Sequence, residues 1–422
     1  MRWAPVALLA AGFLVAGCAA ARPRLGPLGS HLTIYTSLPL VGPEAAAARQ
    51  VERGEELALA AAHGHVGPLT LSLVVLDDAA PKTGSFEPGV VAANARLAAE
   101  DPSGVAYIGD LSSPATAVAL PITNGGLLLQ ISPGSPYIGL TASLDAGQDD
   151  PNRFFPTGLP TFARLVPSDA VEAEAWLAFL RRRGVRSIYL ISSEDPFEIA
   201  PAELLAEAAK RAGLAVAGFD RIHLGAAGEP AEYRGEAERV AKSGAEAVLL
   251  SLPLEGGAVA LTQALHLRSP GLLLLAGHTL AFSSYLGALG AAANRTFVAT
   301  PYLPLAAYPQ ARSILAAYSR TYHEPPQSYA LYGYEAVELV LAALAKAAVA
   351  SRPAVDRAFF SLGPRHGVLG SFAVDLQGEA SLNRYAIWRV GRGLLRRYLI
   401  ATMGPQGPTL AVVGHRRTVS GR

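Results

Sequence analysis

Two short turns carry the residues best suited to chemistry in this chain. Ser112-Ser113-Pro114 follows one predicted strand and opens a predicted helix, with Ser113 as the N-cap and Pro114 as the first helical residue. The free amides of that first helical turn can receive a carboxylate or another acceptor, helped by the helix dipole. The next predicted strand ends at Gly134-Ser135-Pro136, where a ligand can approach the backbone closely. Together the two turns predict a binding site for a small molecule.

Signatures of catalysis and of metal binding are scarce. The chain has no Gly-Lys pair for a phosphate-binding loop, and no G-x-S-x-G, H-E-x-x-H, G-x-G-x-x-G or EF-hand pattern. His63-Gly64-His65 has no nearby partner residues, so a solvated loop is the better interpretation than a metal site. Asp77-Asp78 could serve acid–base chemistry, although a solvated turn with helix-capping acids is favoured. We expect a binding protein and no enzyme, without a cofactor or metal.

The elements that position these turns alternate between strand and helix. Because the early strands are short apolar runs separated by helices, we expect parallel sheets that are buried on both faces. A Gly-, Asp- and Pro-rich break at 145–160 divides the units into two sets. The fold predicted is therefore α/β, with two Rossmann-like doubly wound lobes. The strands are expected at 32–37, 69–76, 105–109, 127–132, 187–192, 214–219, 247–251, 272–276, 296–300, 371–375, 385–390 and 394–401, and the helices at 44–63, 89–100, 114–124, 171–183, 201–212, 231–242, 256–267, 309–322, 328–350 and 353–361.

Composition excludes several classes of protein. The 422 residues are 51% hydrophobic and 16% charged, which is too apolar for a disordered chain and enough for two cores. The chain carries 35 Lys+Arg against 34 Asp+Glu, which argues against a nucleic-acid partner. Beyond the N-terminus no run of 18 apolar residues lacks a charge, so a polytopic membrane protein is excluded.

The N-terminus predicts a secretion signal and a lipid anchor. Arg2 precedes the uncharged apolar stretch Val6–Ala16, which has the length of a signal peptide and is too short to span a bilayer. The stretch runs into Leu14-Val15-Ala16-Gly17-Cys18, which resembles the bacterial lipobox. Cys18 is the only cysteine, so no intramolecular disulfide can form. We expect a lipoprotein of the cell envelope, attached to the membrane through lipid on Cys18 and facing the periplasm or the cell exterior.

Several segments together resemble a known family. The stretch YIGDLSSPATAVALPITNGGLLLQISPGSPYIGLT is similar to the first-lobe signature of type I periplasmic binding proteins, in the branched-chain amino acid branch. The segments IYTSLPLVG, FARLVPSD, SIYLISSEDPF, YGYEAVELVLAAL and GVLGSFAVDLQGE also fit in order and spacing. The resemblance implies two lobes joined by three hinge crossings that close on a small solute. It also implies delivery of that solute to an ABC permease.

The resemblance assigns first-lobe contacts to both turns. The family's serine that receives an amino acid's carboxylate falls on Ser113, beside Ser112. The backbone positions of the second turn fall on Gly134 and Ser135. The family's threonine, whose hydroxyl meets the zwitterion, is replaced by Pro136, which has neither a hydroxyl nor an N–H.

The second lobe departs further from the family's pattern. The aromatic residue that covers the ligand falls on Phe197, and a second aromatic position falls near Pro253. The acid that holds the ammonium falls at about His278 or Thr279, and neither is a carboxylate. Losing an acid and a hydroxyl from a buried site weakens zwitterion binding. A less charged or differently charged solute is therefore at least as good a candidate as a branched-chain amino acid.

Residues around the expected hinge are assigned structural roles. Asp169 is predicted to cap a helix at a crossing and not to contact ligand. Tyr332 and Tyr334, with Glu335, are predicted to pack in the core and hinge. The pair Gly367 and Gly370 is interpreted as another crossing, where glycine permits the backbone changes of closure.

The domain boundaries follow from these assignments. We expect a signal peptide at 1–17, a lipidated tether at 18–30, lobe 1 at 31–164 and 302–367, lobe 2 at 165–301 and 368–402, and a disordered tail at 403–422. The leading hypothesis is a monomeric solute-binding lipoprotein of an ABC importer. An envelope sensor with the same fold, acting through a protein partner, is the alternative. An enzyme on an α/β scaffold is the third hypothesis.

Overall fold

The computed structural model describes residues 26–80, 85–143, 150–223, 230–254, 257–404 and 407–412. The predicted signal peptide, the predicted lipidation site Cys18 and the last ten residues lie outside these ranges. Within the described ranges, no helix combines the length and the apolar character needed to cross a membrane.

The first lobe is built on a six-stranded sheet with the order β2-β3-β1-β4-β5-β6. All its strand pairs are parallel except β2 with β3. The elements of this lobe are β1 (His31–Leu38), α1 (Ala45–Ala61), β2 (His65–Val66), β3 (Leu69–Asp77), α2 (Pro88–Glu100), β4 (Gly104–Ile108), α3 (Ser113–Gly125), β5 (Leu129–Ser132), β6 (Phe162–Arg164), α9 (Arg312–Tyr322), α10 (Tyr329–Lys346), α11 (Arg352–Phe360) and the hairpin β12 (Arg365–Gly367) and β13 (Gly370–Phe372).

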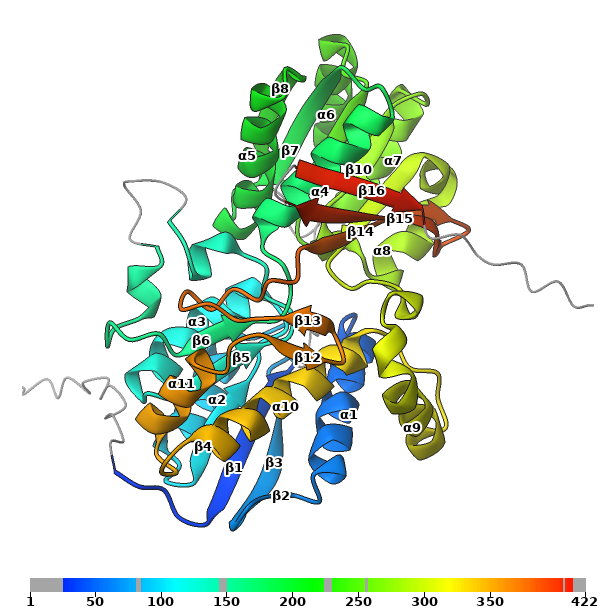
Figure 1. Cartoon of the computed structure of the whole chain (residues 1–422). Coiled ribbons are helices and arrows are strands. Elements are labelled where there is room, and N and C mark those ends of the chain that lie inside the picture. Colours follow the sequence, from blue (N-terminus) through cyan, green and yellow to red (C-terminus); the bar gives the residue numbers. More distant parts are fainter. Residues whose placement is uncertain are drawn as a thin grey trace, which may run out of the picture.

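Both faces of this sheet are covered, which explains why its central strands are apolar throughout. In β1, Ile34 points into the cluster formed with α10 and α11, while Tyr35 points into the cluster formed with α2 and α3. Helix α1 packs along α10 on the first face (Figure 1). The alternation of side chains along a strand thus supplies two separate cores.

The second lobe is built on an eight-stranded sheet with the order β16-β15-β14-β11-β10-β9-β7-β8. Helices α4 and α5 cover one face around Trp176, and α6, α7 and α8 cover the other around Tyr285. The elements are α4 (Asp169–Arg182), β7 (Ser187–Ser193), α5 (Pro196–Arg211), β8 (Ala215–Ile222), α6 (Pro230–Ser243), β9 (Ala247–Ser251), α7 (Ala258–Arg268), β10 (Leu273–Ala276), α8 (Ser283–Ala288), β11 (Thr296–Thr300), β14 (Arg384–Gly391), β15 (Leu394–Gly404) and β16 (Gly407–Val412).

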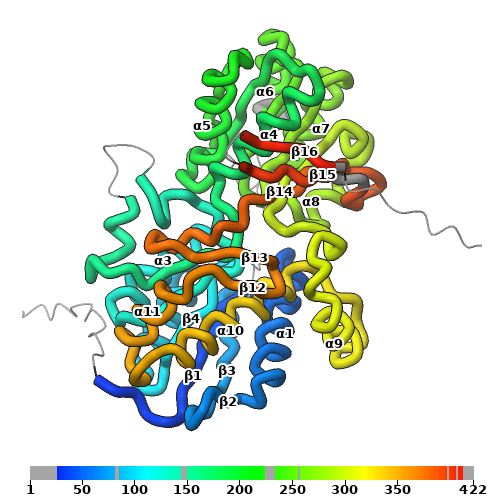
Figure 2. The backbone as a smooth tube through the Cα atoms, in the orientation of Figure 1, coloured from blue at the N-terminus to red at the C-terminus, as the bar shows by residue number. Residues whose placement is uncertain are grey.

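The chain passes between the two sheets three times, after β6, after β11 and before β14 (Figure 2). The third passage lies later than the sequence predicted. Leu369, Phe372 and Ala380 are buried in the core that contains β1 and β4, so residues 368–382 pack with lobe 1 and not with lobe 2. The pair Gly367 and Gly370 closes the β12–β13 hairpin and is not a crossing.

Two terminal predictions also need correction. Residues 407–412, expected within a disordered tail, form strand β16, which pairs antiparallel with β15. At the other end, Leu28 belongs to the expected tether, yet its amide donates to the carbonyl of Ala350 at 2.6 Å. Its side chain packs against the core of lobe 1. Apolar side chains at both ends thus find partners on the lobes.

Candidate functional site

A cavity of about 180 Å³ opens between the two lobes. Its walls come from the loops that follow β1, β3, β4 and β5 in the first sheet and β7, β9 and β10 in the second, and from residues around the crossings. β1 and β4 are neighbours in the first sheet, and β7 and β9 are neighbours in the second. The helices that follow the two strands of each pair lie on opposite faces of the sheet, so the cavity lies at the switch point where open α/β sheets bind ligands. The lining residues are Glu44, Ser85, Phe86, Leu111, Ser112, Ser113, Pro114, Gly134, Pro136, Asp169, Phe197, Glu198, Pro253, Leu254, His278, Thr279, Phe282, Thr300, Pro301, Tyr302 and Tyr329.

The first-lobe wall is the N-terminus of α3, one residue earlier than predicted. Ser112 is the N-cap, with extended backbone, and Ser113 is the first helical residue. The Ser113 hydroxyl accepts a hydrogen bond from the backbone N–H of Tyr137 at 3.1 Å, which joins the helix to the second turn. Both serines line the cavity, so their hydroxyls are placed to meet a polar group of a solute.

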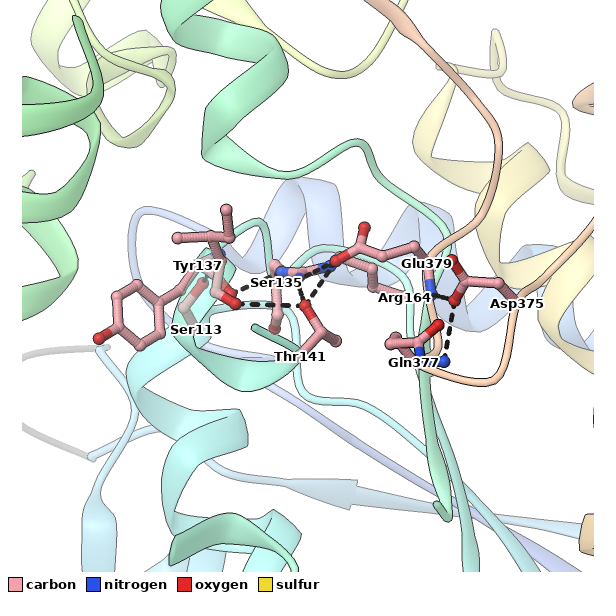
Figure 3. A network of polar contacts seen from close by, with 9 residues as sticks. Ser113, Ser135, Tyr137, Thr141, Arg164, Asp375, Gln377 and Glu379 are labelled. Carbon is pink, nitrogen blue, oxygen red and sulfur yellow. Dashed lines mark hydrogen bonds and ion pairs between the residues drawn. The ribbon is translucent and has the colours of Figure 1, made fainter. Parts of the chain in front are cut away.

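Arg164 holds the second turn in place (Figure 3). Its guanidinium is fully buried and donates to the carbonyls of Ser135 at 3.0 Å and Tyr137 at 2.6 Å. It also contacts the Thr141 hydroxyl, and its Nε donates to Glu379 at 3.0 Å. Because Glu379 precedes the third crossing, one buried cation links that crossing to the cavity wall.

The turn after Gly378 lies against β6 where this link is made. The Arg164 amide donates to the Gly378 carbonyl at 3.0 Å. Gly378 has a φ of +88°, and a Cβ there would lie 2.2 Å from the carbonyl oxygen of Phe162. Only glycine allows this close approach without strain.

The second-lobe wall begins at the N-terminus of α5. The Asp195 carboxylate caps the helix by accepting from the Phe197 N–H at 2.9 Å. The Phe197 ring lies edge-on to Tyr137 of lobe 1, with ring centroids 4.9 Å apart, so this side chain bridges the lobes beside the cavity. The neighbouring Glu198 is buried and accepts hydrogen bonds from Ser251 at 3.2 Å and Thr279 at 3.4 Å.

A cluster of ionisable groups forms the floor of the cavity. The Glu172 carboxylate accepts from His278 Nδ1 at 2.7 Å, from the Tyr385 hydroxyl at 3.0 Å and from Trp176 Nε1 at 3.2 Å. Burial disfavours the charged imidazole, but the charge of Glu172 and its hydrogen bond outweigh burial and raise the pKa of His278 to about 9. We therefore treat Glu172 and His278 as an ion pair.

Asp169 stands next to this pair and lines the cavity, contrary to the prediction that it only caps a helix. Its amide donates to the Pro136 carbonyl at 2.9 Å, so the proline turn positions the acid. The carboxyl is fully buried, and neither oxygen has a hydrogen-bond partner. Burial raises the pKa of Asp169 to about 8, with His278 acting in the opposite direction. Burial likewise raises the pKa of Glu198 to about 7.

The same floor contains a possible metal-ligand set. Asp169, Glu172 and His278 each offer a ligand atom, and these atoms lie within 4.8 Å of one another. Imidazole and carboxylate ligands would suit a divalent transition metal. However, the oxygens of Glu172 are already occupied by three donors, so a metal would have to displace them.

Tyr302 of the second crossing and Tyr329 at the start of α10 close the cavity at the hinge. The Tyr302 hydroxyl donates to the Pro133 carbonyl at 3.1 Å, and its ring lies 4.0 Å from that of Tyr329. Tyr332 packs 4.9 Å from Tyr302 and is buried in the first-lobe core. As predicted, Tyr332 and Tyr334 are core residues, and Glu335 is buried beneath them.

The structure brings together most of the residues named from the sequence. Ser135 is the exception, because its side chain is buried behind the turn and hydrogen-bonds Thr116 at 2.7 Å. The carboxylates Asp169 and Glu198, with Glu172 beneath them, were not predicted as part of the site. The residues predicted from the sequence that do line the cavity are Ser112, Ser113, Gly134, Pro136, Phe197, Pro253, His278 and Thr279.

A second buried acidic pair lies behind the first-lobe wall. Asp78 and Asp110 are both fully buried at the ends of β3 and β4, so Asp78 is not the solvated residue expected. Burial and the charge of Asp110 raise the pKa of Asp78 to about 8. Burial raises the pKa of Asp110 to about 7, although the Tyr107 hydroxyl donates to it at 2.9 Å. The pair does not line the cavity.

Comparison with known families decides the assignment. Residues 33–391 match the model of a family described as periplasmic binding protein. The chain belongs to the periplasmic binding protein family. Members of this family bind solutes and do not catalyse reactions, which confirms the expectation of a non-enzymatic protein. No curated protein sequence matches the chain significantly.

Solved structures of substrate-binding and solute-binding proteins share the fold. A substrate-binding protein from Desulfitobacterium hafniense in complex with Leu matches with a TM-score of 0.68 and 20% identity, covering 90% of this chain and 100% of that one. The leucine-binding protein LivK from Thermotoga maritima gives 0.71 and 19%, with 86% and 97% covered. A solute-binding protein from R. palustris in complex with benzoate gives 0.67 and 16%, with 92% and 98% covered. These matches confirm the predicted two-lobed α/β fold.

Proposed function

We propose that this protein is the extracytoplasmic solute-binding component of an ABC importer. It captures a small amino-acid-like or related polar solute between its lobes and presents the closed form to a permease. We propose that the protein is monomeric and that lipid on Cys18 holds it at the membrane. The single observation that supports this most strongly is the cavity itself, which lies at the switch points of both sheets and takes its walls from both lobes.

The mechanism follows from that placement. A solute that contacts Ser112 and Ser113 on one side, and Phe197 and Glu198 on the other, is bound by both lobes only when they are close together. It therefore stabilises the closed form by its differential affinity. The link from Arg164 to Glu379 keeps the first-lobe wall fixed while the crossings bend.

A thermal-shift screen tests the proposal. The protein is unfolded and refolded to remove carried-over ligand and then screened against amino acids, amides, amines, short peptides, aromatic acids and sugars. A ligand at 100 times its Kd adds about 2.7 kcal/mol of stability. That corresponds to a melting shift of about 5–10 °C for lobes of this size. Stabilisation that is lost in Phe197→Ala and kept in Phe219→Ala, a change on β8 away from the cavity, supports binding in the cleft. The absence of any hit from folded protein favours the alternative of a sensor with a protein partner.

A further inference from the structure

The floor of the cavity contains more acidic than basic groups. Three carboxyls, Asp169, Glu172 and Glu198, lie around one imidazole, His278. The imidazole forms a salt bridge with Glu172 at 2.7 Å, which uses its charge. Among the salt bridges of the described residues, none includes Asp169 or Glu198. Arg164, the other cation whose charge acts on Asp169, is bound to Glu379.

Asp169 marks the position in the cavity where a cationic group of a ligand would bind. Its carboxyl is fully buried, its oxygens have no hydrogen-bond partner, and it lines the cavity. A buried acceptor that is left unpaired costs free energy, and a ligand that donates to it recovers that cost. Glu198 on the same wall accepts only from the neutral hydroxyls of Ser251 and Thr279. Both groups can therefore accept hydrogen bonds from a cationic ligand.

The rest of the lining fits a cation with an apolar body. No Lys or Arg is among the lining residues, and the one cationic donor there, His278, is already paired with Glu172. Aromatic faces attract cations as well as apolar groups. Aromatic rings line the cavity from both lobes and from the second crossing, namely Phe86, Phe197, Phe282, Tyr302 and Tyr329.

We propose that the cleft selects a solute with an ammonium group, held by Asp169 and Glu198, and an apolar body packed against the aromatic rings. A carboxylate on the solute is not required, so amines and amino amides bind at least as tightly as the corresponding amino acid. This inference rests on the proposed solute-binding function and names its substrate class. It also sets this cleft apart from that of the benzoate complex, whose ligand is an anion.

The raised pKa values of the two acids agree with this assignment. Even with His278 nearby, burial keeps Asp169 and Glu198 partly protonated near neutral pH when the cavity holds no cationic ligand. An arriving ammonium favours their charged forms, so binding should release protons. Calorimetry in buffers of different ionisation enthalpy measures that release, and we expect it to increase as pH falls from 9 to 7, because more of both acids is protonated before binding.

The test compares ligands that share one body and differ in charge. For the isobutyl body these are 3-methylbutylamine, leucinamide, leucine and 4-methylpentanoate; for the benzyl body they are phenethylamine, phenylalaninamide, phenylalanine and 3-phenylpropanoate. Affinities are measured by calorimetry on refolded protein at pH 7. Within the better-fitting body, we expect the amine and the amide to match or exceed the amino acid. The acid should bind at least 100-fold more weakly.

Amide variants of the two acids test whether these side chains hold the ammonium group of the ligand. Asp169→Asn and Glu198→Gln should each weaken the amine at least tenfold. Their matched controls are Glu174→Gln on α4 and Glu207→Gln on α5, which remove the same charge from the same helices at half-buried or exposed positions that form surface ion pairs. The controls should leave the affinity within twofold. Urea unfolding of each variant without ligand checks that Asn at position 169, which resembles the protonated acid, keeps the fold.

Three results would overturn the inference. The first is an acid that binds more tightly than its amine. The second is unchanged amine affinity in Asp169→Asn. The third is a saturable shift with ZnCl2 alone that His278→Ala abolishes, which would assign the floor to a metal. If a neutral or anionic solute from the broader screen binds in the cleft and none of these amines does, the charge assignment fails while the solute-binding function stands. If no solute of any class binds, the proposed function itself fails.

Discussion

Removing the charge of Glu379 should loosen the first-lobe wall without touching the cavity. Arg164 is fully buried, and Glu379 is its only anionic partner among the described residues, with a side chain 29% exposed. Removing one partner of a buried ion pair lowers the free energy of unfolding by about 3–5 kcal/mol. Because water reaches Glu379 in part, we expect Glu379→Ala to lower the free energy of unfolding by about 2–3 kcal/mol. Glu379→Gln keeps an acceptor oxygen and should cost about 1–2 kcal/mol.

A surface ion pair of the same chemistry provides the control. Glu246 binds Arg186 at 2.8 Å, but the side chain of Arg186 is 87% exposed. Glu246→Gln should therefore lower the free energy of unfolding much less than Glu379→Gln does. The assay is urea unfolding, combined with hydrogen exchange of residues 133–142.

Hydrogen exchange separates a local effect from a general one. Arg164 donates to the carbonyls of Ser135 and Tyr137, and the Tyr137 amide donates to Ser113. Exchange at the Tyr137 amide should rise at least tenfold in Glu379→Ala and stay unchanged in Glu246→Gln. Equal stability losses in the two Gln variants, or unchanged exchange in the turn, would refute the positioning role of Arg164.

Three further predictions concern other buried charges. The buried Arg352 donates to five backbone carbonyls, those of Ala98, Ala99, Asp101, Gly104 and Gly126. Arg352→Ala should therefore lower the free energy of unfolding by more than about 4 kcal/mol, as measured in urea, whereas Arg357→Ala, at an exposed position on the same helix, should change it by less than about 0.5 kcal/mol. A similar loss of stability in both variants would contradict this. The pKa of Asp78 is raised from 3.8 to about 8, so the folded state holds the extra proton and the free energy of unfolding falls as pH rises from roughly 4 to 8. Asp78→Asn should flatten that fall in urea midpoints taken between pH 5 and 8, and an unchanged slope would exclude the pair as its source. Glu172→Gln should lower the pKa of His278 from about 9, as read from the imidazole resonances by NMR titration, whereas an unchanged value would show that Glu172 does not hold the charge.

The sequence was informative wherever a pattern is local. Short apolar strands alternating with helices predicted the two sheets, and the small residues after β4 and β5 predicted the first-lobe wall. The N-cap was misplaced by one residue because Ser112 and Ser113 are both good caps, and only the backbone angles distinguish them. Likewise, the short edge strand β16 begins with Gly-Pro and lies in a stretch rich in glycine and proline, so it resembles a tail in sequence.

The acids of the site could not be found by local reasoning. Asp169 and Glu198 each follow a helix start, where acids commonly serve as caps or favour the dipole. Their role depends on burial and on His278, which lies more than 75 residues away in the chain. The positions predicted for the family's acid, His278 and Thr279, carry no carboxylate, but the structure supplies carboxylates to the same cavity from α4 and α5. The partner of Arg164 was similarly hidden, because Glu379 is 215 residues away.

Hydrogen exchange with and without a bound solute tests the central claim most directly. If the cleft binds a solute between the lobes, the ligand found in the screen should protect peptides from both walls, around Ser112–Pro114 and around Phe197–Glu198, and Phe197→Ala should reduce that protection. Protection confined to one lobe, or centred on residues away from the cavity, would contradict the account.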